Sequence, residues 1–121
     1  MAKTVTPKFQ ILPRVRIVQG ERIALGPGKA QLLEEVQQHG SISEASKRMK
    51  MSYMRAWLLI REMNTSFKRP LVTAKRGSVK TGGGAHLTRT GLEVMALYRE
   101  MNAKFLGVTQ AEQSQFQKLL R

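Results

Sequence analysis

The chain lacks cysteine, and all 8 of its acidic residues are glutamates, so aspartate is missing as well. Without cysteine it has no disulfide scaffold, no zinc site with cysteine ligands and no thiol nucleophile. No segment approaches the ~20 consecutive apolar residues that a membrane-spanning helix needs. The N-terminal residues lack the apolar stretch of a secretory signal, and we therefore expect a cytoplasmic protein.

Groups suited to catalysis or to metal binding are scarce. The 2 histidines, His39 and His86, are isolated, and neither has a second ligand at metal-binding spacing. Acid–base chemistry would have to be built from scattered glutamates and these histidines. We expect neither an enzyme nor a cofactor or metal site, and no small-molecule effector is evident.

Positive charge is the strongest global feature. The chain has 21 Lys and Arg against 8 acidic residues, a net charge of +13. Of these cations 11 lie between residues 41 and 92, where only Glu44 and Glu62 oppose them. This balance favours a polyanionic partner such as DNA, RNA or an acidic membrane surface. The alternative is a basic surface that is merely solvated.

The first part of the chain predicts a loose lead-in over residues 1–14 and then a small β-hairpin. Apolar and polar side chains alternate over residues 15–19, and the extended pattern resumes at residues 22–25. Gly20 and Glu21 between them suit a turn.

Three helices are expected next. The first starts at Pro27 or Gly28 and ends at His39–Gly40, because proline suits a first turn and glycine a helix end. The second starts at Ser41 or Ser43. The third runs from Tyr53 to Phe67 after a turn at residues 50–52, with Ser52 as its cap. Their apolar residues, spaced as on one helix face, are Leu32, Leu33 and Val36, then Ala56, Ile60, Met63 and Phe67.

Two short strands, residues 71–74 and 85–87, flank a basic glycine-rich loop at residues 75–84. A hairpin at this place is a wing. A last helix runs from its cap Thr88 to about Phe105, and it is apolar on more than one face, which favours a symmetric dimer.

The predicted fold class is mainly α with a small β component: a winged helix-turn-helix with a three-helix core, a hairpin wing and a long C-terminal dimerisation helix. The domain would span residues 15–105, with residues 106–121 as a tail or short helix.

A helix-turn-helix places the start of its second helix in the major groove. The residues expected to read bases there are Tyr53, Met54, Arg55 and Leu58. The residues expected to contact phosphates are Ser43, Lys47, Arg48, Ser52, Arg61, Lys75, Arg76, Lys80 and Thr81. Dimerisation is assigned to Leu92, Met95, Tyr98, Met101 and Phe105, together with the N-terminal hairpin.

For the aromatic residues at the start of the third helix and for the glycine run of the loop, an interpretation without a DNA contact stays open. Tyr53 could serve only as hydrophobic packing, and for Trp57 we favour packing at the margin of the core. The glycine run Gly82–Gly84 lacks the spacing of a nucleotide-binding loop, so a pliable wing tip is the better interpretation. A hairpin loop without function is the alternative.

The stretch GSISEASKRMKMSYMRAWLLIREMN, followed by PLV and KTGGGAHLTRTG, resembles the N-terminal DNA-binding domain of the ModE-type molybdate-responsive transcriptional regulators. More distantly it resembles the winged helix-turn-helix of LysR-type regulators. The likeness covers roughly residues 15–105, and its most specific elements are SYMRAW, EMN and GGGAHLT. It implies a dimeric bacterial protein that binds an inverted-repeat operator, with Ser52–Asn64 as recognition helix and Lys75–His86 as wing.

The chain departs from this family in two respects. Full-length members carry C-terminal molybdate-binding domains with an S-A-R-N-type motif, and we expect this chain to lack its own. Its wing, AKRGSVKTGGGA, is also more cationic than the family's glycine-rich loop, which favours phosphate contact.

The sequence therefore predicts a sequence-specific, double-stranded DNA-binding transcriptional regulator that acts as a homodimer. One alternative is a nucleoid-type architectural protein that binds any duplex. Another is a protein-interaction adaptor built on a winged-helix fold. RNA is less expected as a partner, because no exposed aromatic stacking platform is evident.

Overall fold

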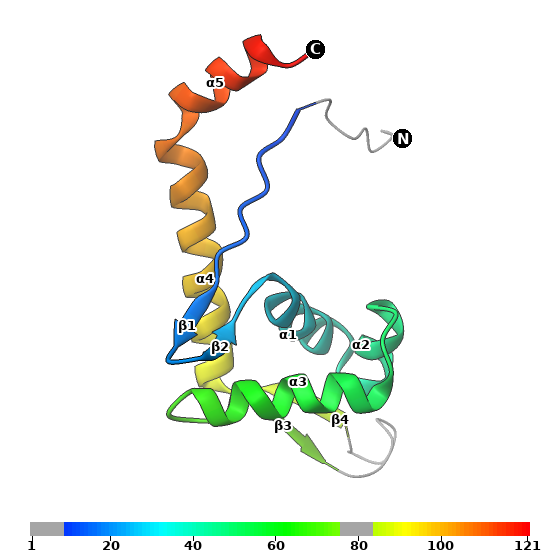
Figure 1. The fold of residues 1–121 in the computed structure, drawn as a ribbon. Coiled ribbons are helices and arrows are strands. Elements are labelled where there is room, and N and C mark those ends of the chain that lie inside the picture. The colour runs from blue at the N-terminus through cyan, green and yellow to red at the C-terminus, as the bar shows by residue number, and fades with distance from the viewer. Residues whose placement is uncertain (1–8, 76–83) are drawn as a thin grey trace.

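A computed structural model describes residues 9–75 and 84–121, in which a short hairpin and three helices lie beside one long helix (Figure 1). In chain order the elements are β1 (Ile17–Gln19), β2 (Arg22–Leu25), α1 (Pro27–His39), α2 (Ile42–Arg48), α3 (Tyr53–Ser66), β3 (Val72–Lys75), β4 (Gly84–Leu87), α4 (Arg89–Val108) and α5 (Gln110–Leu119). The mainly α winged helix-turn-helix predicted from the sequence is confirmed.

Local signals in the sequence set the helix ends. Pro27 lies in the first turn of α1, and Gly40 ends that helix with a φ of 66° while its N–H is donated to the Val36 carbonyl at 2.8 Å. Only glycine adopts this left-handed conformation readily. Three hydroxyls cap the next helix starts by accepting the backbone N–H three residues on: Ser41 at 3.1 Å, Ser52 at 3.0 Å and Thr88 at 3.0 Å. For α2 the structure thereby selects Ser41 rather than Ser43.

The turn between α2 and α3 sets the direction of α3. Lys50 has a φ of 56°, and its N–H is donated to the Lys47 carbonyl at 3.1 Å. The next N–H, that of Met51, is donated to the Ser46 carbonyl at 3.0 Å. These bonds satisfy backbone groups at the end of α2 while the chain changes direction.

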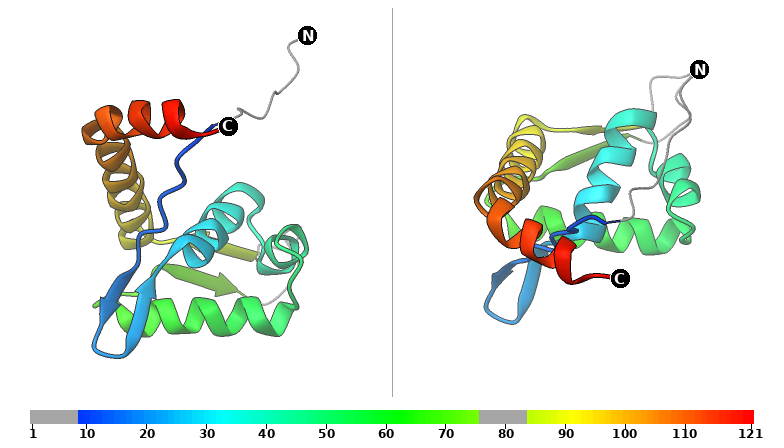
Figure 2. Two further views of the ribbon diagram at one scale, coloured as in Figure 1. Left: turned by 45° about the horizontal axis from the view of Figure 1, so that its top comes forward. Right: turned by 90° about the horizontal axis from the view of Figure 1, so that it is seen from above.

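The core lies where α1, α2 and α3 meet β4 and the first half of α4 (Figure 2). Its fully buried large side chains are Leu32, Leu33, Val36, Ile60, Met63 and Leu71. The apolar faces predicted for α1 and α3 are therefore confirmed, with Phe67 half-buried just past the end of α3.

Two separate antiparallel hairpins complete the fold. β1 pairs with β2 around Gly20, which has a φ of 62°. β3 pairs with β4 in the register Val72↔Leu87 to Lys75↔Gly84, so each wing strand includes one residue beyond its predicted end at the loop side. Strand β4 of the wing packs against α1, and this contact attaches the wing to the helical core.

The C-terminal part is helical. α4 runs to Val108, three residues past its predicted end at Phe105, and α5 follows at an angle to it (Figure 1). Gly91, Met95 and Tyr98 are the buried residues of α4. Met95 and Tyr98, which the sequence assigned to a dimer surface, are only 3% and 7% exposed and belong to the core of the subunit itself. No helix in the described ranges is long and apolar enough to cross a membrane.

Gly91 marks the closest approach of α4 to the strand region. A Cβ built at this position would lie 2.2 Å from the Leu71 carbonyl oxygen, which is backbone and cannot rotate away. We expect Gly91→Ala to lower the free energy of unfolding by about 1–3 kcal/mol through overpacking. Urea unfolding followed by circular dichroism measures the change.

Gly107, on the same helix, is the matched control. A Cβ there meets nothing within 4 Å. Gly107→Ala is therefore expected to raise the free energy of unfolding by about 0.5–1 kcal/mol through helix propensity alone. Equal effects at the two positions would contradict the close contact at Gly91.

Tyr98 connects α4 to the N-terminal segment, since its hydroxyl is donated to the Val15 carbonyl at 2.7 Å. Burial raises the pKa of the Tyr98 phenol above the ordinary value of about 10, although a hydrogen bond with the Asn102 side chain and the charge of Arg14 oppose the shift. The fold thus favours the neutral phenol. The contribution of Tyr98 to the stability of the fold is complete below the pKa of about 10 that a tyrosine has in the unfolded chain. It is lost as pH rises through the higher pKa of Tyr98 in the folded protein.

We therefore expect Tyr98→Phe to cost about 1 kcal/mol at neutral pH through the lost hydrogen bond. It should also lose less stability than the wild type between pH 9.5 and about 11. Thermal unfolding across this range measures both effects. A Tyr98→Phe curve parallel to the wild type would refute the linkage.

Candidate nucleic-acid interface

The outward face of α3 carries large apolar side chains that the described residues leave uncovered. Met54 and Leu58 are 65% and 47% exposed on the side opposite the buried Ala56 and Ile60, and Tyr53, in the first turn of α3, is 50% exposed. Exposed apolar side chains grouped on one helix face indicate an interaction surface. Arg55 is exposed in the same first turns of α3.

The start of α3 is ordered by two interactions. The Ser52 hydroxyl accepts the Arg55 N–H, and the Trp57 indole N–H is donated to the Tyr53 hydroxyl at 2.7 Å. Trp57 was expected at the margin of the core, but it is 37% exposed and is tied to a candidate base-reading residue one turn earlier. The i, i+4 spacing of the two rings was the signal in the sequence that could have revealed this pair.

Exposed polar and basic residues on α2 lie near this face. Ser43, Lys47 and Arg48 are all exposed. Arg48 Nε lies 3.6 Å from Glu44 Oε1, but both side chains are about half exposed, so this pair holds the guanidinium weakly. Arg61 is exposed on the outer side of α3.

On the wing, Lys75 is exposed at the end of β3. Arg76, Lys80 and Thr81, the other wing residues expected to contact phosphates, lie outside the described residues, as does most of the predicted loop at residues 75–84. The described wing strands β3 and β4 lie in the same half of the molecule as α2 and α3 (Figure 1).

Asn64 connects α3 to the wing, a role that the sequence analysis missed. Its side-chain oxygen accepts the N–H groups of Leu71 and Val72 at 2.8 and 3.1 Å, and its NH₂ group is donated to the Val72 carbonyl at 3.0 Å. One amide therefore satisfies three backbone groups at the start of β3. The wing cannot change its position relative to α3 without breaking these bonds.

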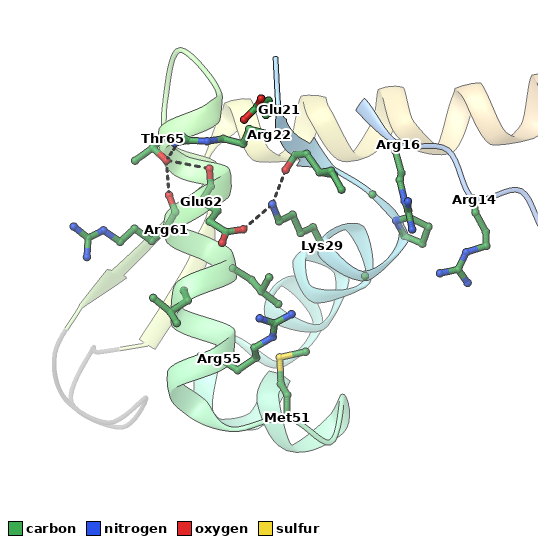
Figure 3. A pocket seen from close by; sticks show the side chains of 16 residues that line it. Arg14, Arg16, Glu21, Arg22, Lys29, Met51, Arg55, Arg61, Glu62 and Thr65 are labelled. Atoms are coloured by element: carbon green, nitrogen blue, oxygen red, sulfur yellow. Dashed lines mark hydrogen bonds and ion pairs between the residues drawn. The ribbon is translucent and has the colours of Figure 1, made fainter. Parts of the chain in front are cut away.

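A basic groove of about 1100 Å³ lies between α3, the β1–β2 hairpin and the start of α1, and it shares Arg55, Leu58 and Arg61 with the exposed face of α3 (Figure 3). Its charged lining residues are Arg14, Arg16, Arg22, Lys29, Arg55 and Arg61, with Glu21 and Glu62. Four of these cations precede residue 41, outside the stretch where the sequence analysis located the basic surface. Arg14 and Arg16, spaced as on one face of an extended segment, were the available signal.

Lys29 holds the groove together. Its Nζ lies 2.9 Å from Glu62 Oε2 of α3 and is donated to the Ile23 carbonyl of β2 at 2.6 Å, and the side chain is only 10% exposed (Figure 3). The Arg22 guanidinium is donated to the Thr65 hydroxyl at 3.4 Å, a second and weaker link from the hairpin to α3.

Comparison with known proteins agrees with this geometry. Residues 28–92 match the model of a family described as bacterial regulatory helix-turn-helix proteins, lysR family. The chain is 42% identical over 78 residues to the transcriptional regulator ModE of Yersinia pestis, covering 64% of this chain and 29% of that protein. It is 37% identical over 89 residues to ModE of Haemophilus influenzae, covering 74% and 34%. For the molybdenum transport protein ModE of Azotobacter vinelandii the identity is 33% over 96 residues, covering 79% and 35%. The chain spans about a third of the length of these relatives.

We expect Asn64→Ala to lower the free energy of unfolding by about 1–3 kcal/mol, because it leaves backbone groups at buried Leu71 and Val72 without partners. Denaturant unfolding measures the change. Ser66→Ala is the control, since the Ser66 hydroxyl bonds only to the Glu62 carbonyl of its own helix, and it should change stability by less than about 0.5 kcal/mol. An unaffected Asn64→Ala protein would mean that the wing is held elsewhere.

Proposed function

Because the chain belongs to the lysR family of bacterial regulatory helix-turn-helix proteins and contains a ModE-type DNA-binding domain, we propose that it regulates transcription by reading a specific duplex sequence as a homodimer. Its family makes it a DNA-binding transcriptional regulator. Sequence specificity, the dimer and a bacterial cytoplasmic location are parts of the proposal. The observation that carries it is the ordered, exposed and partly apolar first half of α3.

In this proposal the start of α3 enters the major groove. Arg55 reads a guanine through its two donors, and Met54, Leu58 and the Tyr53 ring contact thymine methyl groups or sugar. The Ser52 cap and the Tyr53–Trp57 hydrogen bond order these side chains before binding, which lowers the entropic cost of association.

Phosphate contacts come from the elements on either side of α3. α2 supplies Ser43, Lys47 and Arg48, α3 supplies Ser52 and Arg61, and the wing supplies Lys75 with Arg76, Lys80 and Thr81. These contacts orient the subunit on the duplex and carry the salt dependence of binding.

The dimer would form through α4. Leu97, Met101, Phe105 and Val108 are 53%, 46%, 43% and 78% exposed and recur at i, i+4, i+8 and i+11, as on one stripe of a helix. Leu92 is also exposed, at 45%. We leave Met95 and Tyr98 out of this surface because the subunit buries them.

We also propose that DNA binding by these residues needs no bound oxyanion. Contacts within residues 9–75 and 84–121 already hold α2, α3 and the wing strands in place.

Selection of bound duplexes from a random pool tests the proposal. A palindromic consensus whose half-sites are separated by about 34–36 Å, or by a multiple of one helical turn, would support both specificity and the dimer. Binding without a consensus would favour an architectural DNA-binding protein. An absence of binding to any duplex at low salt would favour a protein-interaction adaptor.

On the selected duplex, we expect Arg55→Ala to cost about 1–3 kcal/mol of binding free energy and to relax the preference at one base pair of each half-site. Lys47→Ala, the matched change at a proposed phosphate contact, should weaken all sequences alike and reduce the salt slope by about 0.9 per subunit. Fluorescence anisotropy with single-base variants of the duplex measures both. A uniform loss for Arg55→Ala would remove it from base reading.

A further inference from the structure

The basic groove beside α3 shares Arg55 and Leu58 with the proposed base-reading surface. Its other arginines are Arg22 of the β1–β2 hairpin and Arg14 and Arg16 of the segment that leads into it. All three are exposed. None of the contacts proposed so far uses Arg14, Arg16 or Arg22.

The charges of the groove are unbalanced. Lys29 and Glu62 neutralise each other at 2.9 Å, which leaves five arginines against Glu21 among the charged lining residues. None of these five arginines forms an ion pair with a carboxylate in the described part of the chain. A surface that gathers unpaired guanidinium groups in a hollow attracts an anion.

The spacing of the cations fits an extended anion better than a small one. Arg55 and Arg61 are six residues apart on α3, which separates them by a rise of about 9 Å and by about 120° around the helix, and they point to different sides of α3 (Figure 3). Arg22 of the hairpin and Arg14 and Arg16 before it line the facing wall. Groups spread in this way match a row of phosphates rather than a single ion held by converging donors.

The residues that line the groove also favour duplex DNA over a single-stranded nucleic acid as its ligand. Among the described residues that line the groove none is aromatic, and its apolar wall is formed by Ile23, Pro27, Met51, Leu58 and Leu59. Single-strand sites normally stack bases on aromatic rings, and this groove has none to offer. A sugar–phosphate backbone needs only the cations and a smooth wall.

The groove and the wing flank α3 on opposite sides. Asn64, which holds the wing, and Arg55, which lines the groove, are nine positions apart, and nine steps of about 100° place them about 180° apart around the helix. A helix seated in a major groove has one phosphate backbone on each side.

We propose that the β1–β2 hairpin acts as a second wing, and that Arg22 of the hairpin, with Arg14 and Arg16 of the segment leading into it, binds the backbone of the DNA strand opposite the one that the β3–β4 wing contacts. This inference rests on the proposed function, since it requires α3 to lie in a major groove. It assigns a DNA contact to residues before α1.

The test is a triple variant, Arg14→Gln, Arg16→Gln and Arg22→Gln, on the duplex selected by the wild type. The control is Lys104→Gln, Lys118→Gln and Arg121→Gln, which removes the same charge from exposed positions on α4 and beyond, away from α3. Neither triple changes Lys29 or any residue of α3. Circular dichroism and the thermal midpoint establish that each variant is folded.

The slope of the logarithm of the DNA-binding constant against the logarithm of salt concentration should become shallower by about 2.7 for each bound subunit, because each subunit loses three phosphate contacts. Raising salt from 50 to 200 mM lowers the DNA affinity of both proteins. For each bound subunit, the fold-loss of affinity should be about 40 times larger for the wild type than for the groove variant. The selected consensus should stay the same. Hydroxyl-radical footprinting should show loss of protection on one strand beside each half-site. The lysine triple Arg14→Lys, Arg16→Lys and Arg22→Lys should restore the slope.

Three outcomes would overturn the inference. If the groove variant matches the control variant in affinity and slope while the wild type still selects its duplex, the hairpin does not touch DNA and the proposed function stands. If the groove variant binds DNA normally but loses retention on immobilised polyglutamate, the groove serves an acidic protein partner. If the wild type binds no duplex, the proposed function and the second wing fail together.

Discussion

Leu71 is the residue on which the arrangement of the interface depends. Its side chain is fully buried, its N–H is donated to the Asn64 side chain at 2.8 Å, and its carbonyl accepts the Thr88 N–H at 2.9 Å. The absence of a side chain at Gly91 lets α4 approach that same carbonyl. α3, the wing and α4 are therefore joined at one residue, and none of the three can move independently of the others.

This junction lets a strongly basic chain hold its cations apart from its core. Every buried large side chain is apolar, and the described arginines lie at the surface, most of them without a carboxylate partner. Their mutual repulsion disfavours the compact state, so the fold depends on apolar burial and on a few well-placed hydrogen bonds such as those of Asn64. Lys29 is the exception, because its charge is spent on holding the hairpin against α3 rather than offered to a partner.

Local signals predicted most of the elements. Ser41, Ser52 and Thr88 are caps because a hydroxyl can accept an N–H three residues on, and that geometry depends only on neighbouring residues. The buried faces of α1 and α3 followed from the period of a helix. The surface of α4 was harder: its apolar residues cover more than one face, and their periodicity alone could not tell that Met95 and Tyr98 face the subunit's own core while Met101 and Phe105 stay exposed.

The sequence by itself determined the order of the elements, their caps and the excess of positive charge, since each depends on residue type or on spacing within one helix or strand. Only the tertiary structure decided which cations share a surface. Arg14 and Arg61 are far apart along the chain, yet they line one groove because the hairpin folds back onto α3. The same holds for the Asn64 bonds to the wing and for the burial of Tyr98 under Val15, which require chain segments to meet that no local pattern connects. The basic helix-turn-helix that the sequence predicts is, in the tertiary structure, accompanied by two hairpins that flank α3.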